Sequence, residues 1–400
     1  MKIYTFNELK KQTNLMETKN EFIYCYLDKN LPNERLAFSI NHPYQLTGNI
    51  TGIDWLDSNS NLDIDVPNSI NNLIKNKKLI GVNPFYENCK QKLEDMLSIG
   101  DKKLRIHLLA LGDVGSTLLM GMRLLSTNYP IDYIGIYDRS AEKLKRFELE
   151  INQIYSIDKS NYAPVKILDK NDIFDCDVFI FCASKGVPAV GSNVSDVRMI
   201  QLKENEKILE PYVTEACSKN FKGLFMIVSD PVDHLCLSAN RFSSKTQSPL
   251  LPDQIMGFGL GVMNARATYY SKKIKGLENY ISNGQAFGPH GKQLFIVNDI
   301  YNYDESLSNL LTKKTITANL EVRNLGFKPY IAPALSSGTL SILSILSGSD
   351  NYSAQFLGGV YYGVKNKLVN GRCLSLNSFD MNPNIKKRLS KIKNELEEYI

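Results

Sequence analysis

A glycine-containing turn between an apolar run and a helical pattern is the first feature whose residue types and spacing indicate chemistry. Residues 105–116 read RIHLLALGDVGS, which predicts a buried strand, a tight turn and the start of a helix. Gly112 would let the backbone approach a pyrophosphate, and Gly115 would allow the helix to pack closely on the strand. At the helix start, the N–H groups of Asp113 and Val114 and the helix dipole would favour phosphate oxygens. The turn is therefore a candidate for one part of a dinucleotide site.

The next predicted strand ends in an acidic residue. Asp138 follows the apolar residues 133–137, at the distance from the turn where a carboxylate meets the adenosine ribose hydroxyls. A carboxylate there repels a 2′-phosphate, so NAD is favoured over NADP, although Arg139 follows directly. Ala110 replaces the first glycine of the usual triplet. A lone G-x-x-G also fits an ordinary strand-to-helix turn, so the prediction of dinucleotide binding depends on the turn and the acid together.

Short apolar strands alternate with helical patterns around this turn, which is typical of a parallel sheet covered on both faces. We expect a doubly wound α/β Rossmann domain at residues 101–250 and an α+β domain carrying substrate and catalytic residues at 251–400. A small α+β domain of unknown role is expected at 1–100. The Rossmann strands are expected at 104–109, 133–137, 165–167, 178–182 and 224–228.

The flanking domains also show readable elements. A hairpin is expected around residues 360–376, because Asn370-Gly371 favours a tight turn between two strands. Further strands are expected at 21–27 and 35–40, and helices at 69–77, 87–97 and 384–399.

Composition excludes several functional classes. The 400 residues carry a net charge of +5 without a dense basic run, and no nucleic-acid motif accompanies that charge. The seven cysteines form no C-x-x-C pair, which favours a reducing cytoplasm and argues against a zinc site. No apolar run approaches the roughly 20 residues of a membrane span, and the first residues lack an apolar signal core. We therefore expect a cytoplasmic protein with no metal, membrane or nucleic-acid partner.

The order of five motifs from residue 104 to about 378 resembles the lactate/malate dehydrogenase family. Together they imply an NAD-dependent oxidoreductase, and family members assemble as homo-oligomers. The five are the glycine turn with Asp138; CDVFIFCAS at 176–184; DVR at 196–198 followed by Asn205; VSDPVD at 228–233; and GFGLG at 257–261 with Ala265-Arg266 and GPHG at 288–291.

This resemblance also implies which residues line the cofactor site. Residues 176–184 resemble the family's fourth strand, which runs under the nicotinamide side of the cofactor. Ala183 and Ser184 close that strand, and Ser229 closes the strand that resembles the Asn-Pro-Val-Asp segment. We expect all three to contact the cofactor.

The same resemblance implies the catalytic roles. Reduction of a 2-oxo acid takes a hydride from the nicotinamide and a proton from a neighbouring acid, here His290. Arg266 would bind the substrate carboxylate with a bidentate fork, and Arg198 would polarise the carbonyl oxygen when its loop closes. The alternatives are a structural histidine in a glycine-rich loop, a surface salt bridge at Arg266 and a solvated helix-start charge at Arg198.

Two substitutions depart from the family pattern. Met263 stands three residues before Arg266, where the family has the aspartate that orients the histidine. Asp230 stands where the family has an asparagine that binds the substrate oxygen. Asp230 could replace the missing carboxylate by reaching His290, or it could bind an amine or imine group on the substrate. Alternatively, catalysis has been lost and only cofactor binding survives.

The loop before Arg198 also bears on the expected substrate. Residues 183–198 form a longer loop than the family's, with no residue assignable as the usual specificity selector. Lactate or malate itself is therefore not the expected substrate. One alternative is a specialised enzyme whose residues 1–100 recognise a larger, peptide-like substrate, and another is an inert dinucleotide-binding protein.

Overall fold

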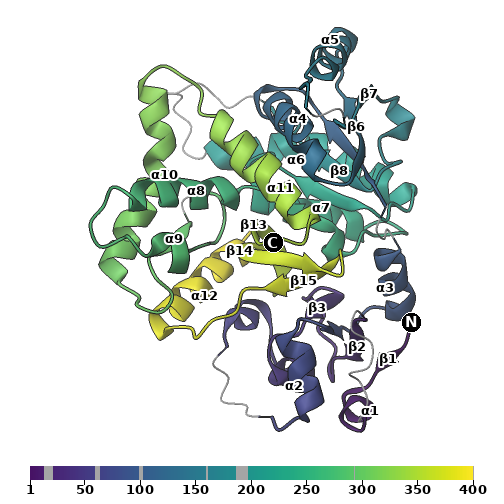
Figure 1. The fold of residues 1–400 in the computed structure, drawn as a ribbon, viewed down its shortest axis with the longest axis vertical. Helices are drawn as coiled ribbons and strands as arrows, with labels where there is room; N and C mark the ends of the chain where they lie inside the picture. Colours follow the sequence, from purple (N-terminus) through teal and green to yellow (C-terminus); the bar gives the residue numbers. More distant parts are fainter. Residues whose placement is uncertain are drawn as a thin grey trace.

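In the computed structural model, one long mixed sheet runs through the described parts of the chain (Figure 1). Those parts are residues 1–12, 21–58, 64–98, 102–158, 161–185, 197–291 and 293–399, with backbone only at 197–199. The sheet has 13 strands, in the order β1-β2-β4-β3-β15-β14-β13-β10-β9-β8-β5-β6-β7.

Six neighbouring strands form the parallel Rossmann half of this sheet. Their order, β7-β6-β5-β8-β9-β10, is the doubly wound order with the first strand in the middle. This arrangement confirms the predicted α/β class. The sixth strand lies after residue 250, inside the segment assigned from sequence to the next domain. The strands are β5 (Leu104–Leu109), β6 (Ile131–Tyr137), β7 (Val165–Ile167), β8 (Val178–Phe181), β9 (Leu224–Ile227) and β10 (Ile255–Gly257).

Helices cover both faces of the parallel half because the strands are apolar on both sides. In β8, Val178 and Ile180 pack into one core cluster, whereas Phe179 and Phe181 pack into the other. The first cluster contains residues of α4 (Asp113–Leu125) and α5 (Ala141–Asn152), and the second contains residues of α6 (Val197–Ser218) and α7 (Val232–Ser244). Short 3-10 turns complete the connections: η3 (Ser126–Asn128), η4 (Lys170–Asp172) and η5 (Pro252–Gln254).

The second domain continues the sheet with antiparallel strands. β13 pairs with β10 through Gly257 and Ala354 and with β14 on its other side, and β14 in turn pairs with β15. The hairpin expected at 360–376 is present, but its partner β13 was not predicted. The elements are α8 (Leu260–Ser271), α9 (Tyr280–Asn283), β11 (Gln285–Phe287), β12 (Phe295–Val297), α10 (Glu305–Asn324), the π-helical segment η6 (Pro333–Leu340), α11 (Ser341–Leu346), β13 (Asn351–Leu357), β14 (Val360–Val369), β15 (Cys373–Leu376) and α12 (Pro383–Glu397).

The N-terminal unit joins the same sheet instead of standing apart. β3 pairs with β15 through Phe38 and Leu374, so the unit in purple lies directly below the yellow hairpin strands in Figure 1. Its elements are β1 (Ile3–Tyr4), α1 (Phe6–Lys10), β2 (Ile23–Tyr26), β3 (Ala37–Ser39), η1 (Pro43–Thr47), η2 (Gly52–Leu56), α2 (Asn68–Lys75), β4 (Leu79–Val82) and α3 (Cys89–Leu97).

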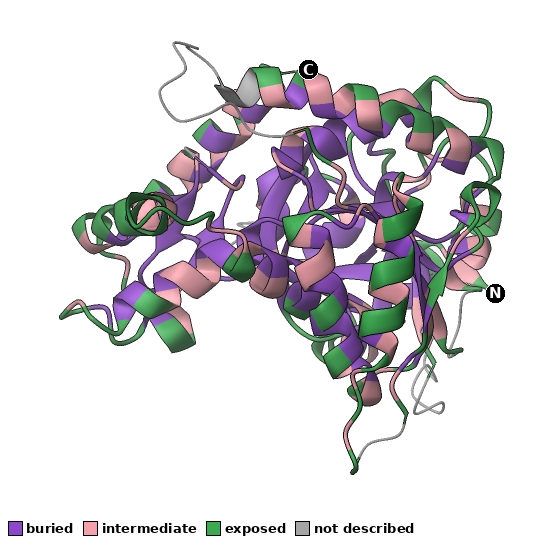
Figure 2. Cartoon of the chain, turned by 90° about the horizontal axis from the view of Figure 1, so that it is seen from above, coloured by how far each residue is buried: buried purple, intermediate pink, exposed green. Residues whose placement is uncertain are grey.

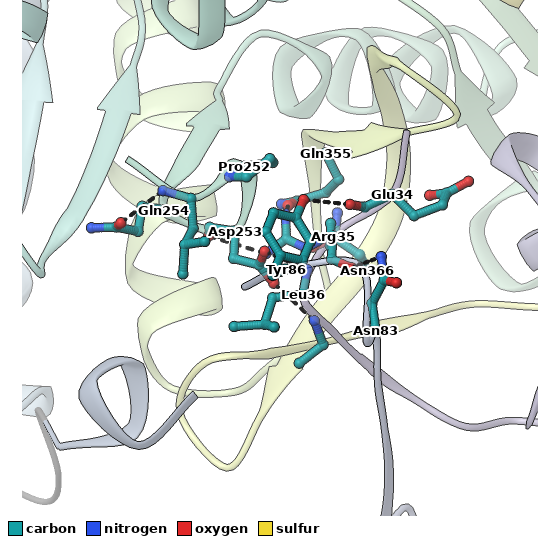
Figure 3. Close-up of polar contacts among 12 residues, drawn as sticks. Glu34, Arg35, Leu36, Asn83, Tyr86, Pro252, Asp253, Gln254, Gln355 and Asn366 are labelled. Atoms are coloured by element: carbon teal, nitrogen blue, oxygen red, sulfur yellow. Dashed lines mark hydrogen bonds and ion pairs between the residues drawn. The ribbon is translucent and has the colours of Figure 1, made fainter. Parts of the chain in front are cut away.

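A buried polar network fixes this junction (Figure 3). The side chains of Arg35 and Asp253 are both fully buried and lie 3.4 Å apart. Arg35 also donates to Gln355 Oε1 at 2.7 Å, and Asp253 accepts the backbone N–H of Leu36 at 2.8 Å. Because both charges are paired and hydrogen-bonded, their burial is tolerated. The network ties the N-terminal unit to η5 and β13. Figure 2 shows the buried residues gathered in the interior of the molecule.

Glu34 beside this network predicts a pH-dependent stability. Burial raises its pKa to about 8 from an ordinary value of 4.5, although the N–H groups of Gly52 and Gly358 oppose the shift. Between these two values the folded chain holds a proton that the unfolded chain has released. The free energy of unfolding therefore falls as pH rises through this window.

We expect Glu34→Gln to abolish this decrease in the free energy of unfolding with rising pH. The variant should therefore be more stable than wild type at pH 9 by a few kcal/mol. Urea unfolding at pH 5, 7 and 9 measures the effect. Glu398→Gln, at an exposed position, serves as the control and should follow the wild type. Parallel pH profiles for Glu34→Gln and wild type would contradict the prediction.

Candidate functional site

The glycine turn lies at the carboxyl end of β5, as its spacing predicts. Gly112 caps α4, and a methyl group placed there would meet no atom within 4 Å. At Gly115 a methyl group would lie 2.0 Å from the carbonyl oxygen of Ala110, so only glycine allows this approach of helix to strand. Ala110 itself adopts a left-handed conformation with φ of 74°, a strain of about 1–2 kcal/mol for a residue with a side chain. The turn thus leaves open space beside Gly112, directly before Asp113 and Val114 at the start of α4.

Asp138 holds the turn from the end of β6. Its carboxylate accepts the N–H of Leu111 at 2.8 Å and that of Ser140 at 3.1 Å, and it lies 3.3 Å from Lys143 Nζ. Burial acts to raise the pKa of Asp138, but these partners outweigh it and the pKa lies below its usual value. Asp138 is therefore an anion beside the glycine turn. Arg139, the next residue, is exposed to solvent.

The ends of β8 and β9 are linked by side-chain hydrogen bonds. Ser229 Oγ donates to the carbonyl oxygen of Ala183 at 2.7 Å. Asn205, from α6, donates to Ser184 Oγ at 3.2 Å and to the carbonyl oxygen of Asp230 at 2.7 Å. These residues share the carboxyl edge of the parallel sheet with the glycine turn, and this edge is where open α/β sheets bind ligands.

His290 and Asp230 form the central pair of the site. His290 Nδ1 lies 2.8 Å from Asp230 Oδ1, although the two residues are 60 positions apart. The side chain of His290 is 15% exposed and that of Asp230 is 43% exposed. An ionised carboxylate can only accept a hydrogen bond, so the imidazole donates from Nδ1. Nε2, the other ring nitrogen, is then left to act on a substrate. The contact agrees with the first of the two roles expected for Asp230.

The backbone around His290 is held by α7 and by the turn before α8. The N–H of His290 donates to Asp233 Oδ2 at 3.2 Å, and Asp233 is a buried residue in the first turn of α7. A methyl group at Gly259 would lie 2.9 Å from His290 Cβ. The absence of a side chain at Gly259 therefore lets the histidine loop settle against the start of α8.

Arg266 lies in α8 and interacts electrostatically with Asp230. Burial lowers the pKa of Arg266, while the negative charge of Asp230 acts in the opposite direction. Its Nη1 contacts Met263 Sδ at 3.6 Å, so Met263 packs against the guanidinium where the resemblance expects an aspartate. An arginine remains charged in such a setting. The Asp230 carboxylate thus contacts His290 and also lies within electrostatic range of the Arg266 guanidinium.

Among the predicted catalytic residues, Arg198 is the one whose backbone alone is described. Arg198 lies in the first turn of α6, where only the backbone is described, and the preceding loop at 186–196 lies outside the described residues. Its role stays a prediction.

Asn205 and Asp233 also contribute hydrogen bonds to the site. Both belong to sequence motifs named above, but those motifs did not indicate a role for either residue. Asn205 lies between the buried residues Leu202 and Leu209 at helical spacing. A polar residue on the apolar face of a helix is the signal that could have identified it.

Two structural findings bear on other functional classes. In the described parts of the chain, histidine, cysteine and acidic side chains form no group of three or more that could hold a metal ion. None of the helices there has the length and apolar character needed to cross a membrane.

Comparison with known sequences finds no matching family model, but it does find similar curated proteins. The chain is 25% identical over 212 residues to the malate dehydrogenase of Aliarcobacter butzleri, covering 53% of this chain and 63% of that protein. It is 24% identical over 191 residues to L-lactate dehydrogenase 1 of Staphylococcus aureus, covering 47% and 55%. The matches thus span less than two thirds of these relatives' length.

Comparison with solved structures shows the fold. A lactate dehydrogenase from a deep-sea metagenome library of the Medee basin aligns with a TM-score of 0.61 and 18% identity, covering 75% of this chain and 98% of that one. The minor L-lactate dehydrogenase of Enterococcus mundtii gives 0.62 and 17%, with the same coverage. The malate dehydrogenase of Archaeoglobus fulgidus, solved in complex with NADH, gives 0.59 and 15%, covering 74% and 98%.

Proposed function

We propose that this chain is a divergent lactate/malate dehydrogenase-like protein that acts as an NAD-dependent oxidoreductase. Its substrate is a carboxylate-bearing 2-oxo or 2-hydroxy acid, or an imine or amine relative, other than ordinary lactate or malate. The observation that carries the proposal is the 2.8 Å contact between His290 Nδ1 and Asp230 Oδ1. This contact supplies the carboxylate partner that Met263 fails to provide, and it weighs against a protein that has lost catalysis.

The described residues fit a dinucleotide at the carboxyl edge of the sheet. The open space at Gly112 and the start of α4 suit a pyrophosphate, and Asp138 lies where it can meet ribose hydroxyls. Ala183, Ser184 and Ser229 would line the nicotinamide side. When bound, NADH supplies the hydride for the substrate carbon.

The protein's own groups then handle the proton and the orientation of the substrate. Protonated His290 donates from Nε2 to the carbonyl oxygen during reduction, while Asp230 on Nδ1 holds the ring and stabilises its positive charge. Arg266 binds the substrate carboxylate through its planar fork. Arg198 would approach the carbonyl oxygen from α6. In the oxidative direction His290 accepts the proton instead.

Asp230 also supports a substrate with a cationic group. Its side chain is 43% exposed, so the carboxylate that orients His290 also faces solvent, where an amine or imine nitrogen could approach it. A keto oxygen gains nothing from such an anion. This exposure is the reason to include imino and amino acids in any substrate screen.

Asp230→Asn is expected to lower kcat for the preferred substrate by about 10²-fold. The reason is that a neutral amide neither stabilises the positive charge of protonated His290 nor fixes its tautomer. NADH affinity should not change. Steady-state kinetics over a panel of 2-oxo, imino and amino acids measures the effect. A rise in 2-oxo acid turnover would contradict the role as partner of His290 and would mean that Asp230 selects the substrate.

Calorimetric titration with NADH and NADPH, followed by the same substrate panel, tests the proposal as a whole. We expect NADH to bind more tightly than NADPH, because of Asp138, and turnover to require His290. Absence of NADH binding would refute the oxidoreductase proposal.

A further inference from the structure

Asn205 is a fully buried amide that connects three segments around the site. Its Nδ2 donates to the carbonyl oxygen of Asp230 at 2.7 Å and to Ser184 Oγ at 3.2 Å. Its Oδ1 accepts the N–H of Lys185 at 2.9 Å. One side chain on α6 therefore contacts both the end of β8 and the residue whose carboxylate reaches His290.

We propose that Asn205 is a positioning residue that sets the orientation of Asp230 and, through it, the tautomer of His290. The chain of contacts is short and continuous. Asn205 binds the main chain of Asp230, and the side chain of Asp230 meets His290 Nδ1 at 2.8 Å. Because a peptide carbonyl fixed from α6 restricts the backbone from which the carboxylate extends, Asp230 meets the ring in one geometry.

A second anchor acts on the adjacent residue. Ser229 Oγ donates to the carbonyl oxygen of Ala183 at 2.7 Å, so Ser229 and Asp230 are both tied to the end of β8, one directly and one through Asn205. His290 in turn is held by the bond from its N–H to Asp233 at 3.2 Å. The two partners of the pair are thus positioned by separate elements, and Asn205 governs the Asp230 side.

The chemistry of an amide explains the residue type. At this position one group must donate twice and accept once, which a buried asparagine does without carrying charge. Leucine has a similar size and would fill the same volume, but it would leave the Asp230 carbonyl and the Lys185 N–H without this partner. The cost should appear in the site and not only in global stability.

The inference rests on the proposed function for its catalytic meaning, but its first test does not require turnover. In the ligand-free full-length protein, ¹⁵N NMR of the histidine rings reports which nitrogen of His290 carries the proton, with the signals assigned by loss in His290→Asn. In wild type we expect the neutral ring to be protonated at Nδ1. In Asn205→Leu we expect a severalfold larger share of the Nε2-protonated form.

Asn83→Leu is the matched control. Asn83 is also fully buried and bridges backbone groups, donating to the carbonyl oxygens of Leu31 at 2.7 Å and Arg35 at 3.2 Å (Figure 3). It lies in the N-terminal unit, so its loss should reduce stability without changing the His290 signals. Asn205→Ala provides a second variant if the leucine variant does not fold.

Kinetics then separates positioning from structural damage. We expect Asn205→Leu to lower kcat by about 10-fold to 100-fold, the range found when partners of site residues are removed. An unaltered His290 tautomer in both Asn205 variants would overturn the inference, whatever the activity. If the tautomer changed in the Asn205 variants but the wild-type protein turned over no substrate, the result would support the positioning role and refute the proposed function.

Discussion

His290→Asn is expected to lower kcat/KM for the preferred substrate by about 10³-fold to 10⁴-fold, with no change in NADH affinity. Asparagine is smaller than histidine and can still donate to Asp230, so the loop anchored by Asp233 should survive. It cannot give or take the proton that accompanies hydride transfer. The expected loss is therefore in the chemical step and not in cofactor binding.

Steady-state kinetics with NADH titration measures both quantities. His42→Asn is the matched control, because His42 contacts Ser378 in the N-terminal unit's junction at 3.3 Å and not the site. That variant should retain wild-type kinetics. If His290→Asn turned over substrate at more than about a tenth of the wild-type rate, a general acid–base role for His290 would be untenable.

Arg266→Leu is expected to lower kcat/KM by about 10³-fold for substrates that carry a carboxylate. Leucine removes the charged fork while keeping apolar contact with Met263. Arg266→Lys should recover only part of the loss, because a point charge cannot form two parallel bonds with a carboxylate.

The comparison that isolates this role uses an aldehyde or ketone lacking the carboxylate. Wild type should prefer the acid strongly, and Arg266→Leu should lose that preference. Arg241→Leu is a suitable control, since Arg241 is a partly exposed residue paired with Glu206 at 3.5 Å. Equal losses on both kinds of substrate would show that Arg266 supports the fold and not the carboxylate.

Five of the six strands in the Rossmann half were predictable because their signals are local. Each of these five is a short apolar run, and the change from strand to helix at Gly112 is visible in the residues themselves. The junction of the N-terminal unit was not. β3 has three residues and meets β15 more than 300 positions away, and a pairing of that kind leaves no periodic pattern in either segment.

The candidate site, like the fold, was predictable only in part. Sequence order placed His290, Arg266 and Asp230 in one family pattern, but it left open whether Asp230 faced the histidine or the substrate. Spacing along a chain does not fix a distance across 60 residues, whereas the folded structure gives 2.8 Å. Asn205 went unassigned because a hydrogen bond to a backbone carbonyl depends on tertiary packing.

Transfer of deuterium to the product from NADH dideuterated at nicotinamide C4 tests the central claim most directly. The protein is incubated with labelled NADH and the panel of 2-oxo and imino acids, and the products are examined by mass spectrometry. We predict a deuterium-labelled 2-hydroxy or 2-amino acid that requires His290. Failure to bind NADH, or an unlabelled product from every substrate, would contradict hydride transfer by this site.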